Sequence, residues 1–181
     1  MIYVVEPHAD DAFLSLGGHI ERWITSGGRV TIVTVYSGTR KRGRDAKAYA
    51  DAVGAGWRGL GFVESGSSSK AKPLPEDVFH GVFSDDPVIL GPVGFQHAEH
   101  REVYDRLPSW SQFYLDVPYA IALKNSDPIT ECISGMIVVS YLRPPFRKWR
   151  HIPLFRDQGK FFWMNPPEKL KHTFELILRR P

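Results

Sequence analysis

The first 64 residues alternate strand-like and helix-like segments, and this order limits the fold more than any other feature of the chain. Residues 2–5 form a short apolar run that predicts a buried strand. In residues 13–24 the apolar side chains recur at helical spacing. Residues 29–36 are rich in β-branched side chains and predict a second strand. Strand–helix–strand units with short links form parallel sheets with right-handed crossovers, so we expect an α/β protein.

The pattern continues along the chain with less regularity. It predicts helices at about 44–53, 76–83, 99–107 and 168–179, and strands at 60–64, 88–90 and 138–142. Residues 143–167 contain five prolines and six aromatic residues without a clear period, and we assign them no structure.

Composition and length limit the class of protein. A chain of 181 residues with 43% hydrophobic and 24% charged residues fits one globular domain and excludes general disorder. No apolar run approaches the roughly 20 residues of a membrane span, and the first residues lack the basic start of a secretory leader, so we expect a cytoplasmic protein. The single cysteine, Cys132, excludes a disulfide framework, and any metal must be held by histidine and carboxylate.

The charge is unevenly distributed. Residues 143–181 hold ten basic and three acidic residues, whereas residues 1–142 hold 13 basic and 17 acidic residues. We interpret the basic, aromatic portion at 143–181 as packing on a single domain that spans 1–181, with a solvated face that borders the substrate. The alternative is a non-catalytic binding module that uses this portion to hold anionic polymers.

Two short motifs carry side chains suited to catalysis. His8, Asp10 and Asp11 follow the first predicted strand, and His97 and His100 follow the strand predicted at 88–90. Ligand sites of open parallel sheets lie at the carboxyl ends of strands, so we expect the two motifs to meet. Two histidines and one aspartate, with a fourth position open, match the ligand set of a catalytic zinc.

Each motif alone also fits an ordinary structural role, as a helix cap or an exposed helical turn. Their joint occurrence after two predicted parallel strands favours a site. His19 lies off the apolar face of its predicted helix, and we interpret it as a packing or surface histidine.

At these motifs the sequence resembles the PIG-L/LmbE-like zinc-dependent N-acetylglucosaminide deacetylases. Residues 7–20 are similar to their opening signature, His-Pro-Asp-Asp-Glu followed by Gly-Gly in a helix. Residues 97–103 are similar to their second signature, His-Pro-Asp-His-Arg-x-Val. Residues 42–54 are similar to the helix between them, and the resemblance extends over about residues 1–107. It implies a Rossmann-like three-layer sandwich with a mainly parallel sheet.

The resemblance also implies residue roles. His8, Asp11 and His100 would bind one Zn²⁺ or another divalent metal, and Asp10 would take a proton from a metal-bound water. His97 would stabilise the oxyanion and later protonate the leaving amine.

Arg42 and Arg44 are our candidates for holding the substrate, because a guanidinium binds sugar hydroxyls or anions bidentately. Ala12 stands where the family has glutamate, which leaves open how the ligands are oriented.

We therefore expect an enzyme that removes the N-acetyl group from an N-acetylated amino sugar or its conjugate. An amidase for another N-acyl conjugate is the alternative within the same chemistry. The expected partner is a small amino-sugar conjugate rather than nucleic acid or a membrane, and a homo-oligomer remains open.

Overall fold

The structure is a computed structural model that describes residues 1–65, 72–95, 97–116, 133–142, 146–155 and 175–181. It contains a mixed sheet of seven strands in the order β3-β2-β1-β4-β5-β7-β6. The strands are β1 Ile2–Glu6, β2 Val30–Thr34, β3 Gly56–Gly59, β4 Val88–Pro92, β5 Gln112–Tyr114, β6 Ile137–Leu142 and β7 Glu175–Arg179. The helices are α1 Asp11–Thr25, α2 Arg40–Val53, α3 Ala98–Arg106 and the 3₁₀ helix η1 Phe146–Leu154.

The first five strands are parallel, and β7 and β6 run antiparallel at one end of the sheet. From β1 the chain builds outward in both directions, since β1 pairs with β2 on one side and with β4 on the other. The strand order therefore reverses between β1 and β4, and ligands of open α/β sheets bind at the carboxyl ends of the strands at such a point.

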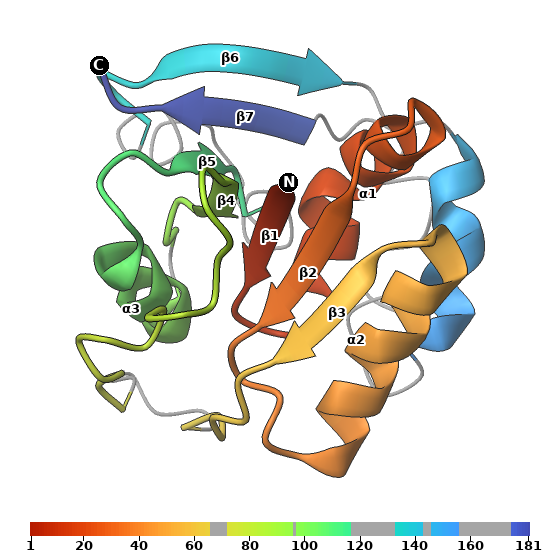
Figure 1. Ribbon diagram of the computed structural model, residues 1–181, viewed down its shortest axis with the longest axis horizontal. Helices are drawn as coiled ribbons and strands as arrows, with labels where there is room; N and C mark the ends of the chain where they lie inside the picture. The colour runs from red at the N-terminus through yellow and green to blue at the C-terminus, as the bar shows by residue number, and fades with distance from the viewer. Residues whose placement is uncertain (66–71, 96, 117–132, 143–145, 156–174) are drawn as a thin grey trace, which may run out of the picture.

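Helices cover both faces of the sheet (Figure 1). Val4, in the middle of β1, packs in a core with α1, α2 and Phe155, whereas Val5 packs on the opposite face in a core with α3. Neighbouring residues of one strand are therefore buried on opposite faces, as expected for a parallel sheet between two layers. The prediction of an α/β three-layer sandwich with a mainly parallel sheet is confirmed.

Three predicted elements are wrong. The strand expected at 60–64 lies earlier, at Gly56–Gly59, because the left-handed Gly54 ends α2 and the chain enters the sheet directly. Residues 76–83 form turns instead of a helix. Glu175–Arg179 is strand β7 rather than the end of a helix. A short run of consecutive apolar residues fits a strand that is buried on both faces as well as it fits a buried helix, so the sequence pattern does not distinguish the two. Residues 168–174 lie outside the described residues.

The sequence pattern predicts the start of helix α2 incorrectly and does not predict strand β5. Helix α2 begins at Arg40 instead of about residue 44, because Thr39 accepts a hydrogen bond from the Arg42 backbone N–H and caps the helix early. Strand β5 has only three residues, too few to show a recognisable strand pattern in the sequence. No helix in the described parts of the chain is long and apolar enough to cross a membrane. The single domain over 1–181, with 143–181 packed on it, stays a prediction.

Candidate metal centre and active site

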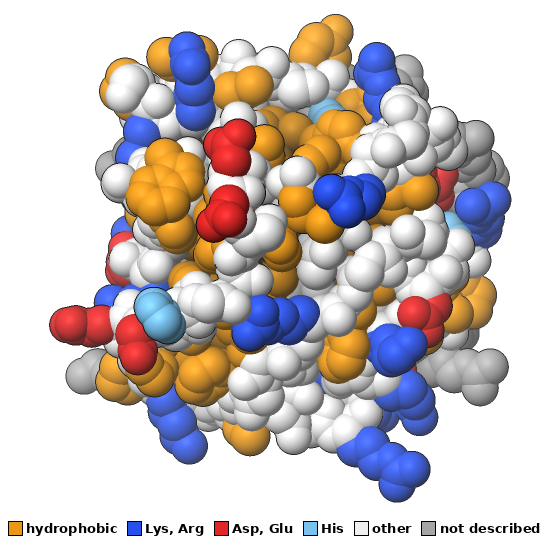
Figure 2. Space-filling model, viewed as in Figure 1, with side chains coloured by type: hydrophobic (Ala, Val, Ile, Leu, Met, Phe, Trp, Pro, Cys, Tyr) orange, Lys and Arg blue, Asp and Glu red, His pale blue; other side chains and the backbone are white. Residues whose placement is uncertain are grey.

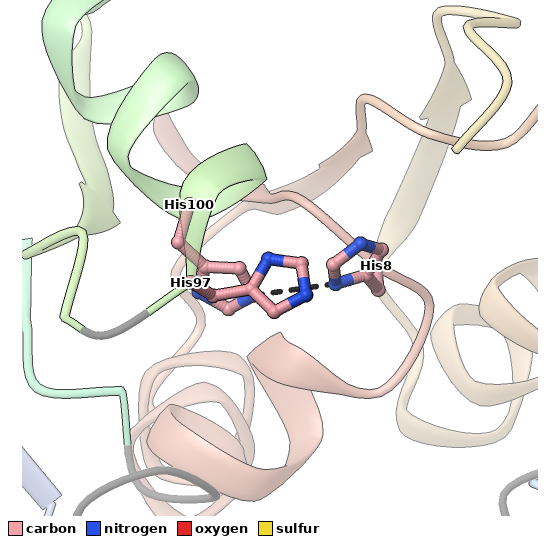
Figure 3. A group of neighbouring side chains, drawn as sticks. All are labelled: His8, His97 and His100. Atoms are coloured by element: carbon pink, nitrogen blue, oxygen red, sulfur yellow. Dashed lines mark hydrogen bonds between the residues drawn. The ribbon is translucent and has the colours of Figure 1, made fainter. Parts of the chain in front are cut away.

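The two motifs meet at the carboxyl ends of β1 and β4. His8 lies in the short link between β1 and α1, and Asp11 is the first residue of α1. His97 precedes α3, and His100 lies in its first turn. Figure 3 shows the three imidazoles converging from these two segments.

Three donor atoms form a compact triangle. His8 Nδ1 lies 3.4 Å from Asp11 Oδ2 and 3.2 Å from His100 Nε2, and His100 Nε2 lies 3.2 Å from Asp11 Oδ2. Ligands of a tetrahedral zinc at its usual bond lengths are about 3.3 to 3.4 Å apart. The three atoms are therefore spaced as the protein ligands of one such ion.

His97 is the third histidine of the cluster. Its ring centroid lies 5.1 Å from that of His8 and 5.0 Å from that of His100, and one nitrogen of each ring falls within 4.8 Å of the others. The three imidazoles are thus a second candidate donor set. His97 can either ligate a metal or act on a molecule held beside it.

Carboxylates orient both inferred histidine ligands. His8 Nε2 lies 2.7 Å from Glu99 Oε2, and His100 Nδ1 lies 2.8 Å from Asp116 Oδ1. Ser65 donates to Glu99, and the Phe95 N–H donates to Asp116 at 2.8 Å. Histidines that bind metals characteristically donate their second ring N–H to a carboxylate, which turns the other nitrogen toward the ion.

The sequence analysis did not assign Glu99 and Asp116 to the site. Glu99 lies between the two histidines of the second motif, and Asp116 follows the carboxyl end of β5. Both carboxylates could have been predicted as partners of the histidines from these two positions, beside the second motif and after the end of a parallel strand.

Burial and neighbouring charges shift the titration of the cluster. Burial lowers the pKa of His8 and His100, but Asp11, with Glu99 at His8 and Asp116 at His100, outweighs it and raises their pKa values to about 9 and about 10. Burial opposes ionisation of Asp11, but His100 and His8 hold its pKa below its ordinary value. The cluster of His8, Asp11 and His100 therefore favours a bound positive charge. Protons on the two histidines supply this charge in the absence of a metal, and a metal cation that binds there displaces them.

Asp10 and His97 have the protonation states that acid–base chemistry needs. Burial and Asp11 raise the pKa of Asp10 to about 6, while Arg42 opposes the rise. Burial, together with His100 and His8, lowers the pKa of His97 to about 4. At pH 7 Asp10 is therefore an ionised base of nearly matched pKa, and His97 is neutral.

Arg42 and Arg44 have different surroundings. Arg42 Nε pairs with Glu64 Oε1 at 2.6 Å, and its Nη1 lies 3.8 Å from Asp10 Oδ1. Arg44 pairs with Asp45 at 3.1 Å, and its side chain is 65% exposed. The structure brings Arg42 to the site beside Asp10, and the assignment of both arginines to the substrate stays a prediction.

The Glu6 side chain of β1 contacts the start of α1, where Ala12 stands at the position of glutamate in the PIG-L/LmbE-like signature. The Ala12 N–H donates to Glu6 Oε2 at 3.0 Å, and the Thr34 hydroxyl donates to Glu6 Oε1 at 2.7 Å. Glu6 is fully buried. It links the first turn of α1 to the ends of β1 and β2.

No family model and no curated protein matches the sequence. Solved structures do match. An A40926 pseudoaglycone deacetylase, Dbv21, superposes with a TM-score of 0.77 at 19% identity, over 98% of this chain and 96% of that one. The chain has the fold of a deacetylase.

Two further structures extend this likeness. The zinc-inhibited form of teicoplanin deacetylase Orf2 has a TM-score of 0.69 at 14% identity, over 99% of this chain and 98% of that one. The N,N'-diacetylchitobiose deacetylase of Pyrococcus horikoshii has a TM-score of 0.60 at 15% identity, over 97% and 82%. The resemblance to the PIG-L/LmbE-like deacetylases is confirmed for the fold. Because a fold hosts many reactions, the reaction itself must be argued from the site.

Proposed function

We propose that the protein is a metal-dependent hydrolase that removes the acetyl group from an N-acetylated amino sugar or its conjugate. The observation that carries this proposal is the triangle of His8 Nδ1, Asp11 Oδ2 and His100 Nε2, with sides of 3.2 to 3.4 Å. A divalent metal held there, best matched by Zn²⁺, would polarise the amide carbonyl and lower the pKa of a water molecule.

The remaining residues have roles that follow from their positions. Asp10 accepts the proton of the attacking water, since its carboxylate is adjacent to the ligand Asp11 and ionised at neutral pH. Arg42, which is itself paired with Glu64, lies 3.8 Å from that carboxylate and favours its ionised form. His97 is neutral, so it donates its ring N–H to the developing oxyanion. The proton that Asp10 has taken from the water is then delivered to the leaving amine, with His97 returning to its neutral form if it relays that proton.

Two observations favour the acetyl group of an amino-sugar conjugate over other acyl groups. The three superposed proteins are deacetylases, and one of them acts on a diacetylated disaccharide. Arg42 stands at the edge of the site with its guanidinium already paired to carboxylates, a geometry suited to further hydrogen bonds with hydroxyl groups.

The basic C-terminal portion gives no support to the polymer-binding alternative where it is described. Arg150 lies 3.9 Å from Glu21, and the guanidinium of Arg180 stacks 4.9 Å over the rings of Tyr104 and Phe113. These cations contact the body of the protein.

The deciding experiment measures acetate release by the metal-loaded protein from N-acetylglucosamine, N,N'-diacetylchitobiose and N-acetylglucosaminyl conjugates. A matched panel carries longer acyl groups on the same amines. We expect release from at least one N-acetyl substrate and its loss in Asp10→Asn. Preference for a longer acyl group would replace the deacetylase assignment by the amidase alternative.

A further inference from the structure

A second polar cluster lies away from the metal site, where α1 meets the antiparallel end of the sheet. His19 Nδ1 lies 2.9 Å from Glu175 Oε2, and His19 Nε2 lies 3.2 Å from Ser140 Oγ. The three side chains come from α1, β7 and β6. A carboxylate, an imidazole and a hydroxyl joined in this order have the arrangement of a hydrolytic triad.

The carboxylate of this cluster is firmly held. Glu175 is fully buried, and it accepts hydrogen bonds from the backbone N–H groups of Gly18 and His19 at 2.8 and 2.9 Å. These two hydrogen bonds fix the position of the carboxyl group against the backbone of α1. In the tautomer in which His19 Nδ1–H donates to that carboxylate, Nε2 is placed to accept the Ser140 hydroxyl proton.

Ser140 lies where a small molecule can reach it. It is partly exposed, whereas His19 is buried with 4% exposure. Strand β6 is the last strand of the sheet among the described residues, and its pairing with β7 shifts register between Val138 and Ser140. Irregularities of this kind redirect a side chain and are common beside active sites.

The exposed side chains of strand β6, on both sides of Ser140 in the chain, are apolar. Ile137, Val138, Val139 and Tyr141 are between 41% and 68% exposed, and β6 contains no charged residue. Figure 2 shows hydrophobic side chains together with some Lys and Arg side chains along the upper edge of the molecule, where Figure 1 places β6 and β7. An edge strand also directs some backbone N–H groups outward, and such groups can stabilise an oxyanion. This surface fits an uncharged acyl chain.

The cluster is separate from the metal centre. His19 follows Asp11 by eight residues on the same helix, which places their Cα atoms about 12 Å apart along its axis. The residues around Ser140 belong to β6 and β7, whereas the inferred metal ligands follow β1 and β4.

We propose that Ser140, His19 and Glu175 form a second, metal-independent hydrolytic site for esters of apolar carboxylic acids. Ser140 Oγ attacks the ester carbonyl carbon, and its proton passes to His19 Nε2. The carbon–oxygen bond to the alcohol breaks, and the alcohol leaves with that proton. A water molecule then attacks the acyl-serine, His19 takes the water proton and returns it to Ser140 Oγ, and the carboxylic acid is released.

The test uses an alkyl fluorophosphonate, which a triad serine displaces at phosphorus with loss of fluoride. The full-length protein is incubated with the probe after removal of metal by chelation, and the modified peptide is identified by mass spectrometry. We expect modification at Ser140 in the folded protein and none after heat denaturation. His19→Gln should slow labelling by about 100-fold or more, the contribution of a positioned base. The exposed Ser26→Ala, at the end of α1, is the matched control and should leave the rate unchanged.

A second readout is hydrolysis of p-nitrophenyl butyrate. The activity should persist after chelation and in Asp10→Asn, and it should disappear in Ser140→Ala. Circular dichroism and the Tm show whether each variant is folded, and the wild type and Ser140→Ala decide the question even if His19→Gln does not fold. Absence of labelling at Ser140 in the wild type would overturn the proposal, as would an unchanged labelling rate in folded His19→Gln. Either result would leave the cluster a structural link between α1 and the sheet edge.

Discussion

His8 Nδ1 lies 3.2 Å from His100 Nε2, although 92 positions separate the two residues in the chain. The parallel pairing of β1 with β4 brings them together, since each strand delivers its following loop to the same edge of the sheet. Two imidazole nitrogens at this distance, beside the Asp11 carboxylate, are spaced for one small cation.

Asp10→Asn should remove most activity while leaving metal binding intact. The amide cannot accept the proton of the attacking water, and a positioned base contributes about 10²- to 10⁴-fold to the rate. The measurement is kcat for acetate release, together with metal content by elemental mass spectrometry. The matched control is Asp51→Asn, which alters an exposed carboxylate paired with Lys47. Full activity in Asp10→Asn would show that another group is the base.

Glu99→Gln should weaken metal affinity about 10- to 100-fold, because the hydrogen bond to His8 Nε2 orients that ligand. A competition titration with a chromogenic chelator measures the change in Kd. Asp105→Asn, on the exposed side of the same helix α3, serves as the control and should match the wild type. Equal affinity in Glu99→Gln and Asp105→Asn would remove Glu99 from the site.

Arg42→Ala should move the acidic limb of the pH profile upward. Activity needs ionised Asp10, whose pKa is raised to about 6 by burial and Asp11 while the Arg42 cation opposes the rise. Without that cation the pKa of Asp10 rises further, so activity is lost at a higher pH. The measurement is kcat/KM from pH 5 to 9, with Arg40→Ala, an exposed residue at the start of α2, as control. A limb that stays in place or moves down would contradict the assigned roles.

Glu6→Gln should make stability less dependent on pH. Burial raises the pKa of Glu6 to about 8, well above that of the same group in the unfolded chain. Between these two values the unfolded chain releases a proton that the folded protein retains, so this group destabilises the fold progressively as pH rises from about 4 to 8. A glutamine can accept from the Ala12 N–H through its carbonyl oxygen and donate to the Thr34 hydroxyl through its amide N–H, and it does not ionise.

Urea unfolding of the wild type and of Glu6→Gln from pH 5 to 8 measures this effect. The variant should gain relative to the wild type as pH rises. A difference in unfolding free energy that does not vary with pH would show that Glu6 is ionised in the folded protein.

The sequence allowed the parallel core and the two motifs to be predicted because both depend on local patterns. The apolar residues of β1 and the helical spacing of α1 are visible over a few positions, and the position of His8 between them follows directly. The joint placement of His8 with His100 followed from the rule for strand ends.

The rest depended on contacts between distant segments. No local pattern in the sequence indicates that Glu175 lies in a strand and binds His19. The contact between these two side chains forms only because β7 joins the sheet next to β5. The third strand is predicted at 60–64 but lies at Gly56–Gly59, because its sequence, Gly-Trp-Arg-Gly, lacks the β-branched residues that are typical of a strand. The partner of His100, Asp116, is set by the fold across 16 positions of the chain.

The central claim is that His8, Asp11 and His100 hold one divalent metal. Elemental analysis of the protein after Zn²⁺ loading and removal of excess metal tests it most directly, with Asp11→Asn and His100→Ala measured beside Asp51→Asn. We expect about one zinc per chain in the wild type and in Asp51→Asn, and far less than one in the two ligand variants. A wild type without stoichiometric metal, or ligand variants that retain it, would contradict the account.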